Sequence, residues 1–271
     1  MPKVSIMLIT HDRPAFIPEA IDSVLSQSFT DWELVVVDNG STDQKVGEIL
    51  RNYEIKDTRV KFYPQSLSVD IPTVRNTALD FCSGEYLAII DSDDIWHDQD
   101  KLTKQVKFLD KNHDYVLVGS GVIVIGEKGQ EKKRYLNPET DKEIRKIILF
   151  RNPVAHSSVV FRMIAVKEID GYNPDLKIGE DYDLSLRLGQ EKKMYNFPEY
   201  FIKYRVHSNG VCSQNMVLAL KNNLKIIKKY KSFYPNYITA MMRRKIRLFA
   251  FQCLSLFSTT ASQKSEDGVT L

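Results

Sequence analysis

The sequence is poor in cysteine and has no long apolar run. Its three cysteines, Cys82, Cys212 and Cys253, lie far apart and form no CxxC pair. This spacing supports neither a disulfide framework nor a zinc site built on thiolates, and it favours a reducing compartment. The first apolar run ends before His11 and a late one over 248–257 is short, so we expect no signal peptide and no membrane-spanning helix. We therefore expect a cytoplasmic protein, at most peripheral to the inner face of the cell membrane.

The sequence also lacks the glycine-rich loops with which many enzymes hold phosphates. It has 12 glycines but neither a GxGxxG nor a GxxxxGK[ST] motif. A dinucleotide-dependent dehydrogenase and a P-loop NTPase are therefore disfavoured. A sugar-1-phosphate nucleotidyltransferase ranks low for a similar reason, because that chemistry normally shows a Gly-rich, basic N-terminal loop and this chain has no glycine before Gly40.

Acidic residues are absent from the stretch 200–265, although the whole chain has a formal charge of only +3. The stretch holds 12 Lys and Arg, which leaves 26 basic and 35 acidic residues in the remainder. A basic segment is usually a solvated face, and contact with an anionic membrane surface is the alternative. We expect no nucleic-acid partner.

The first 112 residues alternate short apolar runs with helical patterns. Strands are predicted over 4–10, 33–38, 60–64 and 85–91, with helices near 14–27, 43–53 and 72–82 between them. Runs such as LVVV and YLAII, in which apolar and polar residues do not alternate, are typical of strands covered on both faces. The sequence therefore predicts an α/β fold with a mostly parallel central sheet flanked by helices. Ligands of such sheets bind beyond the carboxyl ends of the strands.

Four parts are predicted along the chain. Residues 1–112 and 113–212 form the two halves of one α/β domain, and a hairpin or an excursion is expected near 126–135. A basic amphipathic helical extension follows over 213–258, because its apolar residues recur with helical spacing. The tail over 259–271 is predicted to be disordered.

Polar clusters follow three of the predicted strands, at 10–13, in DNGSTD from Asp38, and in DSDD. Asp38 alone is better explained as a turn residue. Asp91, Asp93 and Asp94 are different, because carboxylates ~5 Å apart repel by roughly 3 kcal/mol at an effective dielectric near 20 unless a cation lies among them. Carboxylate oxygens suit Mg²⁺ or Mn²⁺, so DSDD predicts a divalent ion held together with substrate phosphates.

Five stretches, in order over residues 3–207, resemble family 2 glycosyltransferases of the GT-A fold. They are VSIMLITHDRP, ELVVVDNGSTD, TVRNTALDFCSGEYLAIIDSDDIW, GYNPDLKIGEDYDLSLRL and YRVH. The resemblance implies a metal-dependent, inverting transfer of a sugar from a nucleotide diphosphate sugar, which we expect to be UDP-linked. The acceptor is expected to be a hydroxyl of a glycan or lipid-linked molecule in cell-surface polysaccharide biosynthesis. Residues 1–112 would bind the nucleotide sugar, and residues 113–212 would bind the acceptor and supply the base.

The resemblance also implies roles for individual residues. Asp181 matches the general base that takes the proton from the acceptor hydroxyl. The residues expected to bind the nucleotide sugar are Thr10, Asp12, Arg13, Asp38, Arg75, Asp91 and Ser92. The expected ligands of Mn²⁺ or Mg²⁺ are Asp93, Asp91 and His207. The residues expected to contact the acceptor are His156, Glu180 and Trp96.

Structural alternatives stand beside these roles. Acids such as Glu180 and Asp181 also favour a helix N-terminus through the helix dipole. His156 and Ser157 are also explained by a buried turn, and Trp96 by core packing. Asp94 is also explained as a turn residue, and Asp91 as a contact of either the ribose or the metal.

Some features depart from the family, and some alternatives remain open. HDR stands at 11–13 where the family more often has an aromatic residue followed by Asn, VDIPTVRN lacks the usual glycine, and Ala78 replaces another. A prenyl-phosphate sugar synthase and an inactive nucleotide-sugar-binding scaffold are the further functional alternatives. For the late helix near 237–257 three roles remain open: it covers the domain, it forms a homodimer, or it lies in a lipid interface.

Overall fold

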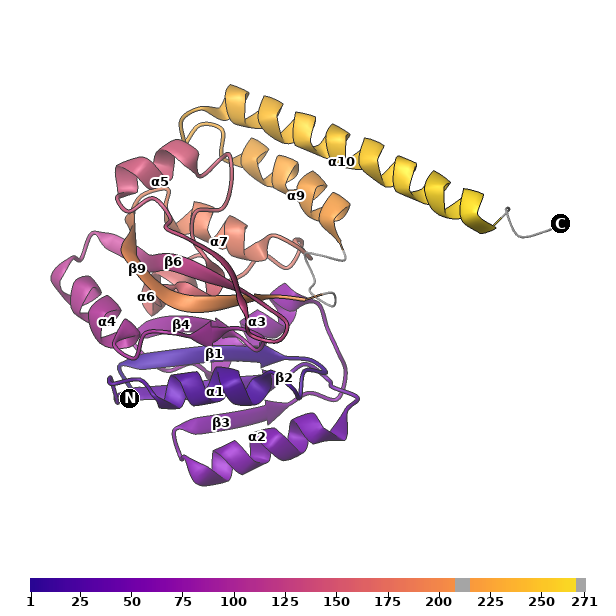
Figure 1. Ribbon diagram of the computed structural model, residues 1–271. Helices are drawn as coiled ribbons and strands as arrows, with labels where there is room; N and C mark the ends of the chain where they lie inside the picture. Colours follow the sequence, from indigo (N-terminus) through magenta and orange to yellow (C-terminus); the bar gives the residue numbers. More distant parts are fainter. Residues whose placement is uncertain (208–214, 267–271) are drawn as a thin grey trace.

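A nine-stranded sheet runs through the computed structural model, which describes residues 1–207 and 215–266 and the side chains up to residue 252 (Figure 1). The strands are β1 (Val4–Thr10), β2 (Trp32–Asp38), β3 (Val60–Pro64), β4 (Tyr86–Asp91), β5 (Ile95–Trp96), β6 (Tyr115–Gly126), β7 (Glu131–Tyr135), β8 (Val160–Arg162) and β9 (Lys193–Val206). Their order is β3-β2-β1-β4-β8-β6-β9-β5, with β7 paired to β6. Strands β1 to β4 are parallel, and β8 is antiparallel to both of its neighbours.

Helices cover both faces of this sheet. They are α1 (Ile17–Leu25), α2 (Gln44–Lys56), α3 (Ile71–Phe81), α4 (Lys101–Lys111), α5 (Asp141–Ile147), the 3₁₀ turn η1 (His156–Ser158), α6 (Met163–Glu168), α7 (Glu180–Leu188), α9 (Met216–Lys229) and α10 (Tyr237–Glu266). Leu34 and Val36 of β2 pack in the core with α1, α2 and α4, whereas Val35 and Val37 pack in the core with α3, α5, α6, α7 and α9. The predicted α/β fold and the burial of the apolar strands on both faces are confirmed.

The second half of the domain continues the same sheet. β6 and β7 form the hairpin expected near 126–135. β9 starts at Lys193, earlier than the strand predicted from residue 200, because residues 193–197 also pair with β6. The pairing shifts between Phe197 and Tyr200, where Pro198 interrupts the pattern of a strand in the sequence.

The C-terminal helices pack against the end of the domain that contains α5 and α7, and Figure 1 shows α10 projecting beyond α9. Ala240 is fully buried, and Arg244 Nε donates to the carbonyl of Leu149 at 2.7 Å. The helical extension is therefore present, but α10 continues to Glu266, where the sequence predicts a disordered tail from residue 259. Extending an existing helix adds one hydrogen bond per residue, which favours continuation through polar residues. Among the helices within residues 1–207 and 215–266, none has the combination of length and hydropathy that a membrane span needs.

Candidate active site

The carboxyl ends of β1, β2 and β4 meet at one edge of the sheet. Thr10 pairs with Asp38 across β1 and β2, and Ile9 pairs with Asp91 across β1 and β4. The polar clusters predicted to follow these strands therefore lie together. Thr10 is buried, and its Oγ1 has no hydrogen-bond partner among the described residues. An unsatisfied buried hydroxyl at this edge is a candidate contact for a ligand.

Acids hold the turn after β2 in place. Asp38 Oδ1 accepts hydrogen bonds from the backbone N and the Oγ of Ser41, at 3.0 and 2.5 Å. Asp12, whose φ is +50°, accepts from the amides of Thr42 and Asp43 at 2.7 and 2.9 Å. The amide of Asp43 is the largest cause of a lowered pKa at Asp12. These bonds are typical of turn acids, so Asp12 ties the loop after β1 to the loop after β2.

Arg75 of α3 connects Asp91 to the start of α7. Its Nη2 donates to Asp91 Oδ1 at 3.0 Å, and its Nε lies 3.4 Å from Glu180 Oε1. The side chain is buried, and within the described residues Nε makes no hydrogen bond. Desolvation raises the pKa of Asp91, but the charge of Arg75 and smaller effects of other neighbours outweigh it and hold this pKa below its usual value. Asp91 is thus an ionised carboxylate beside the first turn of α7.

Two basic side chains contact the carboxylate of Asp93. Arg13 Nη1 donates to Asp93 Oδ2, and His207 Nε2 lies 2.8 Å from the same oxygen. His207 follows the end of β9, so the sheet brings it to the loop after β4. Its ring packs on Phe16, with 5.3 Å between the ring centroids. Arg13 therefore places a positive charge at Asp93, as Arg75 does at Asp91.

Asp94 faces the protein interior. It is 1% exposed, and its Oδ1 accepts a hydrogen bond from the amide of Arg205 at 2.9 Å, while its Oδ2 contacts the Ser157 hydroxyl. Burial, followed by the charges of Asp93 and Asp91, raises the pKa of Asp94 well above its usual value. Asp94 therefore joins the loop after β4 to β9 and η1, as a structural residue would.

The predicted base lies in the first turn of α7. Asp181 is half-buried, and its Oδ2 accepts a hydrogen bond from Asn152 Nδ2 at 3.1 Å. Burial raises the pKa of Asp181 above its usual value. Burial, followed by the charge of Asp181, raises the pKa of Glu180 to about 7. Both acids are therefore harder to ionise than in an unfolded chain, because burial disfavours their charged forms.

A buried ion pair anchors α7 behind these acids. Asp183 is fully buried, accepts from Arg187 Nε at 2.8 Å and accepts from the Tyr230 hydroxyl of α9 at 2.7 Å. Arg187 also donates to the carbonyls of Ile169 and Gly171, at 2.7 and 2.6 Å. These bonds join α7, α9 and the loop after α6, and so they fix the direction of the first turn of α7.

His156 is half-buried, whereas Trp96 lies in the core. His156 Nε2 is 3.1 Å from the Tyr172 hydroxyl, and burial, followed by the charge of Arg75, lowers the pKa of His156 to about 3. Trp96 is 3% exposed in the core, where its Nε1 donates to the carbonyl of Ser157 at 2.9 Å. The expected acceptor contact of Trp96 is therefore corrected to core packing, because its ring is covered by the protein.

Arg205 bears on the site and is not among the residues predicted from the sequence. Its side chain is buried and donates to the carbonyls of Asp93 and Glu127, at 2.9 and 2.8 Å, and to Glu19 Oε2 at 2.8 Å. Arg205 lies in the stretch YRVH, two residues before His207, and this position is the feature of the sequence that could have indicated its place at the site. Ser92, between the acids, is buried.

Asp93 and His207 are the best-placed ligands for a divalent ion. Within the described residues, no three Asp, Glu, His or Cys side chains form a cluster that could hold a metal. An adjacent carboxylate and imidazole fit an ion that takes its other ligands from water and from the phosphates of a substrate. Asp91, the third expected ligand, is engaged by Arg75 and by Ser157 Oγ at 3.1 Å.

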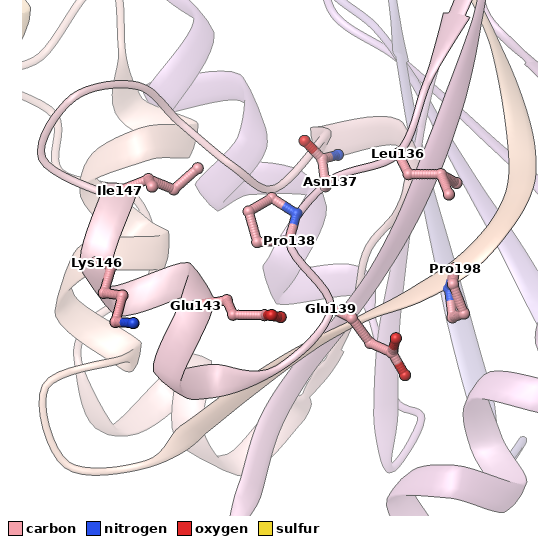
Figure 2. Close-up of a pocket in the computed structure, with 8 residues that line it drawn as sticks. All are labelled: Leu136, Asn137, Pro138, Glu139, Glu143, Lys146, Ile147 and Pro198. Carbon is pink, nitrogen blue, oxygen red and sulfur yellow. The ribbon is translucent and has the colours of Figure 1, made fainter.

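A pocket of about 500 Å³ opens elsewhere, between the β7–α5 connection, α5 and β9 (Figure 2). It is lined by Leu136, Asn137, Pro138, Glu139, Glu143, Lys146, Ile147 and Pro198. Its two carboxylates already have protein partners, since Glu143 caps α5 and Glu139 accepts from the Tyr195 hydroxyl at 2.7 Å. None of the residues predicted for the site lines this pocket.

Comparisons with known proteins show the family of this chain. The profile of the family described as Glycosyl transferase family 2 matches residues 5–169. The O-antigen biosynthesis glycosyltransferase WbnJ of Escherichia coli is 31% identical over 219 residues, which are 80% of this chain and 84% of WbnJ. The putative teichuronic acid biosynthesis glycosyltransferase TuaG of Bacillus subtilis is 37% identical over 225 residues, 81% of this chain and 85% of TuaG.

Solved structures share the fold. S. aureus TarS 1–349 in complex with UDP-GlcNAc superposes with a TM-score of 0.68 at 20% identity, over 89% of this chain and 72% of that one. The mannosyltransferase PcManGT of Pyrobaculum calidifontis, in complex with GDP-Man and Mn²⁺, has a TM-score of 0.68 at 16% identity, over 100% and 76% of the two chains. At these identities the likeness shows the fold, and it confirms the expected GT-A architecture.

Proposed function

The chain belongs to glycosyl transferase family 2, and from this premise we propose that it moves a sugar from a UDP-sugar to a hydroxyl of a saccharide acceptor in polysaccharide synthesis. The nucleotide sugar is supported by the UDP-GlcNAc bound to TarS, and the acceptor class by the names of WbnJ and TuaG. We propose inversion, because a direct displacement at the anomeric carbon needs one base and no covalent intermediate.

Asp181 is the base in this proposal. It takes the proton from the acceptor hydroxyl as the oxygen attacks, and its pKa, raised by burial, makes it a stronger base than an ordinary aspartate. Asn152, which donates to Asp181 Oδ2, orients the carboxylate. Glu180, with a pKa of about 7, is largely neutral below that pH and competes little for the same proton.

The edge of the sheet receives the donor. Thr10, Asp38 and Ser92 line the nucleoside part of the site, and Asp91 contacts the ribose from its position beside Arg75. As the sugar leaves, negative charge develops on the diphosphate, and the guanidinium groups of Arg13 and Arg75 can stabilise it. Asp93 and His207 would hold Mg²⁺ or Mn²⁺, which when bound supplies Lewis-acid stabilisation of the same charge.

The bridge made by Arg75 is the observation that carries the proposal. One guanidinium contacts Asp91 on the donor side and lies 3.4 Å from Glu180, the neighbour of the candidate base. Donor and acceptor must meet within a few ångströms for a direct displacement, and this bridge keeps the two sides that close.

Transfer from a panel of UDP-sugars to saccharide and lipid-linked acceptors, with Mn²⁺ present, tests the function. Asp181→Asn is expected to lower kcat roughly 10²- to 10⁴-fold while it leaves donor affinity close to that of the wild type. Glu48→Gln, on the exposed side of α2, is the matched control and should leave both quantities unchanged. Wild-type turnover by Asp181→Asn would remove Asp181 from the mechanism.

The exposed face of α10 supports a place of action at an anionic membrane. Four apolar residues fall within one arc of this helix and are between 59 and 72% exposed: Ile238, Met242, Ile246 and Phe249. Exposed Lys245 and Arg243 lie on either side of the arc. A helix with an apolar stripe between basic residues is suited to the surface of a bilayer that contains anionic lipid. We propose that α10 brings the enzyme to the membrane that carries its acceptor.

Sedimentation with vesicles tests this contact. The wild type is expected to sediment with phosphatidylglycerol vesicles but not with phosphatidylcholine vesicles, and Ile246→Glu should abolish binding. Ile55→Glu is the matched control, because Ile55 is 80% exposed on α2. A dimer in solution that Ile246→Glu dissociates, without vesicle binding, would instead assign this face to a second copy of the chain.

A further inference from the structure

Arg13 occupies the carboxylate oxygen that a divalent ion would use. Its Nη1 donates to Asp93 Oδ2, which also lies 2.8 Å from His207 Nε2. The side chains of Arg13 and Asp93 are only 21% and 14% exposed, so this contact is largely shielded from water. A shielded guanidinium–carboxylate pair is stronger than an exposed one.

The backbone of Arg13 is fixed, so movement is confined to its side chain. Its carbonyl accepts hydrogen bonds from the amides of Phe16 and Ile17 at 3.1 and 3.3 Å. The preceding residue, Asp12, is tied to the amides of the loop after β2. The long, flexible side chain can therefore turn from one anion to another without unfolding the loop.

We propose that Arg13 and a divalent ion compete for Asp93, and that the diphosphate of the donor receives the guanidinium when the ion displaces it. This inference rests on the proposed function, because it requires a nucleotide diphosphate in the site. Two cations bound to one carboxylate oxygen repel each other, so binding of the ion must drive Arg13 away. A diphosphate is the natural destination, because guanidinium groups pair with phosphate oxygens in a bidentate manner.

The competition has a consequence that a purely structural role for Arg13 lacks. Removing the guanidinium should strengthen binding of the free ion and weaken binding of the donor. Binding of ion and donor would be coupled through Arg13, and a coupling between two ligands acts equally in both directions. Opposite changes in the two affinities are therefore the signature of the exchange.

Manganese titration of the full chain, followed by electron paramagnetic resonance without nucleotide, measures the affinity for the free ion. Arg13→Gln is expected to bind Mn²⁺ roughly 5- to 150-fold more tightly than the wild type, and calorimetry at saturating Mn²⁺ should show UDP-sugar binding weakened by a similar factor. Arg13→Lys, which keeps the charge, should bind Mn²⁺ as weakly as the wild type.

The control is Arg134→Gln, which breaks an exposed pair with Glu131 and should change neither affinity. Unchanged or weaker Mn²⁺ binding by Arg13→Gln, or no Mn²⁺ binding by either protein, would overturn the inference. Transfer activity of the wild type is measured on the same preparation. Its absence would count against the proposed function, whereas activity with unaltered Mn²⁺ binding in Arg13→Gln would count against the exchange alone.

Discussion

Replacing Glu180 by Gln should remove a pH-dependent loss of stability that this carboxyl group imposes on the protein. Glu180 is 6% exposed at the start of α7, and burial with the charge of Asp181 raises its pKa from 4.5 to about 7. Arg75 Nε, 3.4 Å away, opposes this change but makes no hydrogen bond among the described residues. The buried acid is therefore more stable protonated than ionised at every pH below about 7.

The sign and size follow from the two pKa values. Between pH 4.5 and 7 the folded protein keeps a proton on Glu180 that the unfolded chain has released, so stability falls as the pH rises through this window and levels off above it. At 1.36 kcal/mol per pKa unit, the group accounts for a loss on the order of 3 kcal/mol, most of it between pH 5 and 8. Gln cannot ionise, so the variant should lack this part of the decline.

Urea unfolding of the wild type and Glu180→Gln at pH 5 and pH 8 measures the effect. The difference between the two proteins isolates Glu180, because other titrating groups contribute to both. Glu48→Gln on the exposed side of α2 should follow the wild type. If the ion pair with Arg75 dominated instead, the pKa of Glu180 would be lowered, its stabilising effect would be complete above pH 4.5, and the two proteins would show equal pH dependence between pH 5 and pH 8. That result would refute the reasoning.

Three further predictions concern the base and its supports. Because the pKa of Asp181 is raised, the loss of kcat/KM on acidification should begin at a higher pH than it would for an ordinary aspartate. A rate that is flat down to pH 4 would exclude Asp181 as the base. Arg205→Lys should lower the free energy of unfolding by about 2 kcal/mol in a urea titration, because an ammonium cannot span the three acceptors of the guanidinium; no change would contradict this role. Tyr230→Phe should cost about 1 to 3 kcal/mol by the same measurement, since it leaves one oxygen of buried Asp183 without its donor, whereas Tyr237→Phe serves as the control.

Local sequence patterns were sufficient to predict the sheet and the edge at which the acids gather. Apolar runs ended at Thr10, Asp38 and Asp91, and parallel pairing required their carboxyl ends to lie together. The resemblance to the family selected Arg75 and Asp181, which the structure connects through Glu180.

Contacts between distant segments could not be predicted in the same way. Arg13 contacts Asp93 across 80 positions, and Arg205 binds the carbonyl of Asp93 across 112 positions. No local pattern specifies which Arg meets which acid, because those pairings depend on loop conformations and on the path of β9. Trp96 illustrates the same limit, since an aromatic residue next to acids has the same sequence context whether it faces a substrate or the core.

The three acids at the end of β4 and in the loop after it avoid mutual repulsion by different means. Asp91 is paired with Arg75, and Asp93 is paired with Arg13. Asp94 has no guanidinium partner in the described residues, and it shares the hydroxyl of Ser157 with Asp91.

A hydroxyl has a single proton to donate, so Ser157 cannot satisfy two ionised carboxylates at once. The conflict disappears when Asp94 is neutral, because its own proton can then be donated to Ser157 Oγ while Ser157 donates to Asp91. The hydrogen-bond count depends only on geometry, and it leads to the same neutral Asp94 as the raised pKa, which burial and neighbouring charges cause. Two arginines and one retained proton thus stabilise a cluster whose carboxylates would otherwise repel by roughly 3 kcal/mol per close pair. Asp91 remains ionised beside Arg75, Asp93 keeps its ion pair with Arg13, and Asp94 holds the loop after β4.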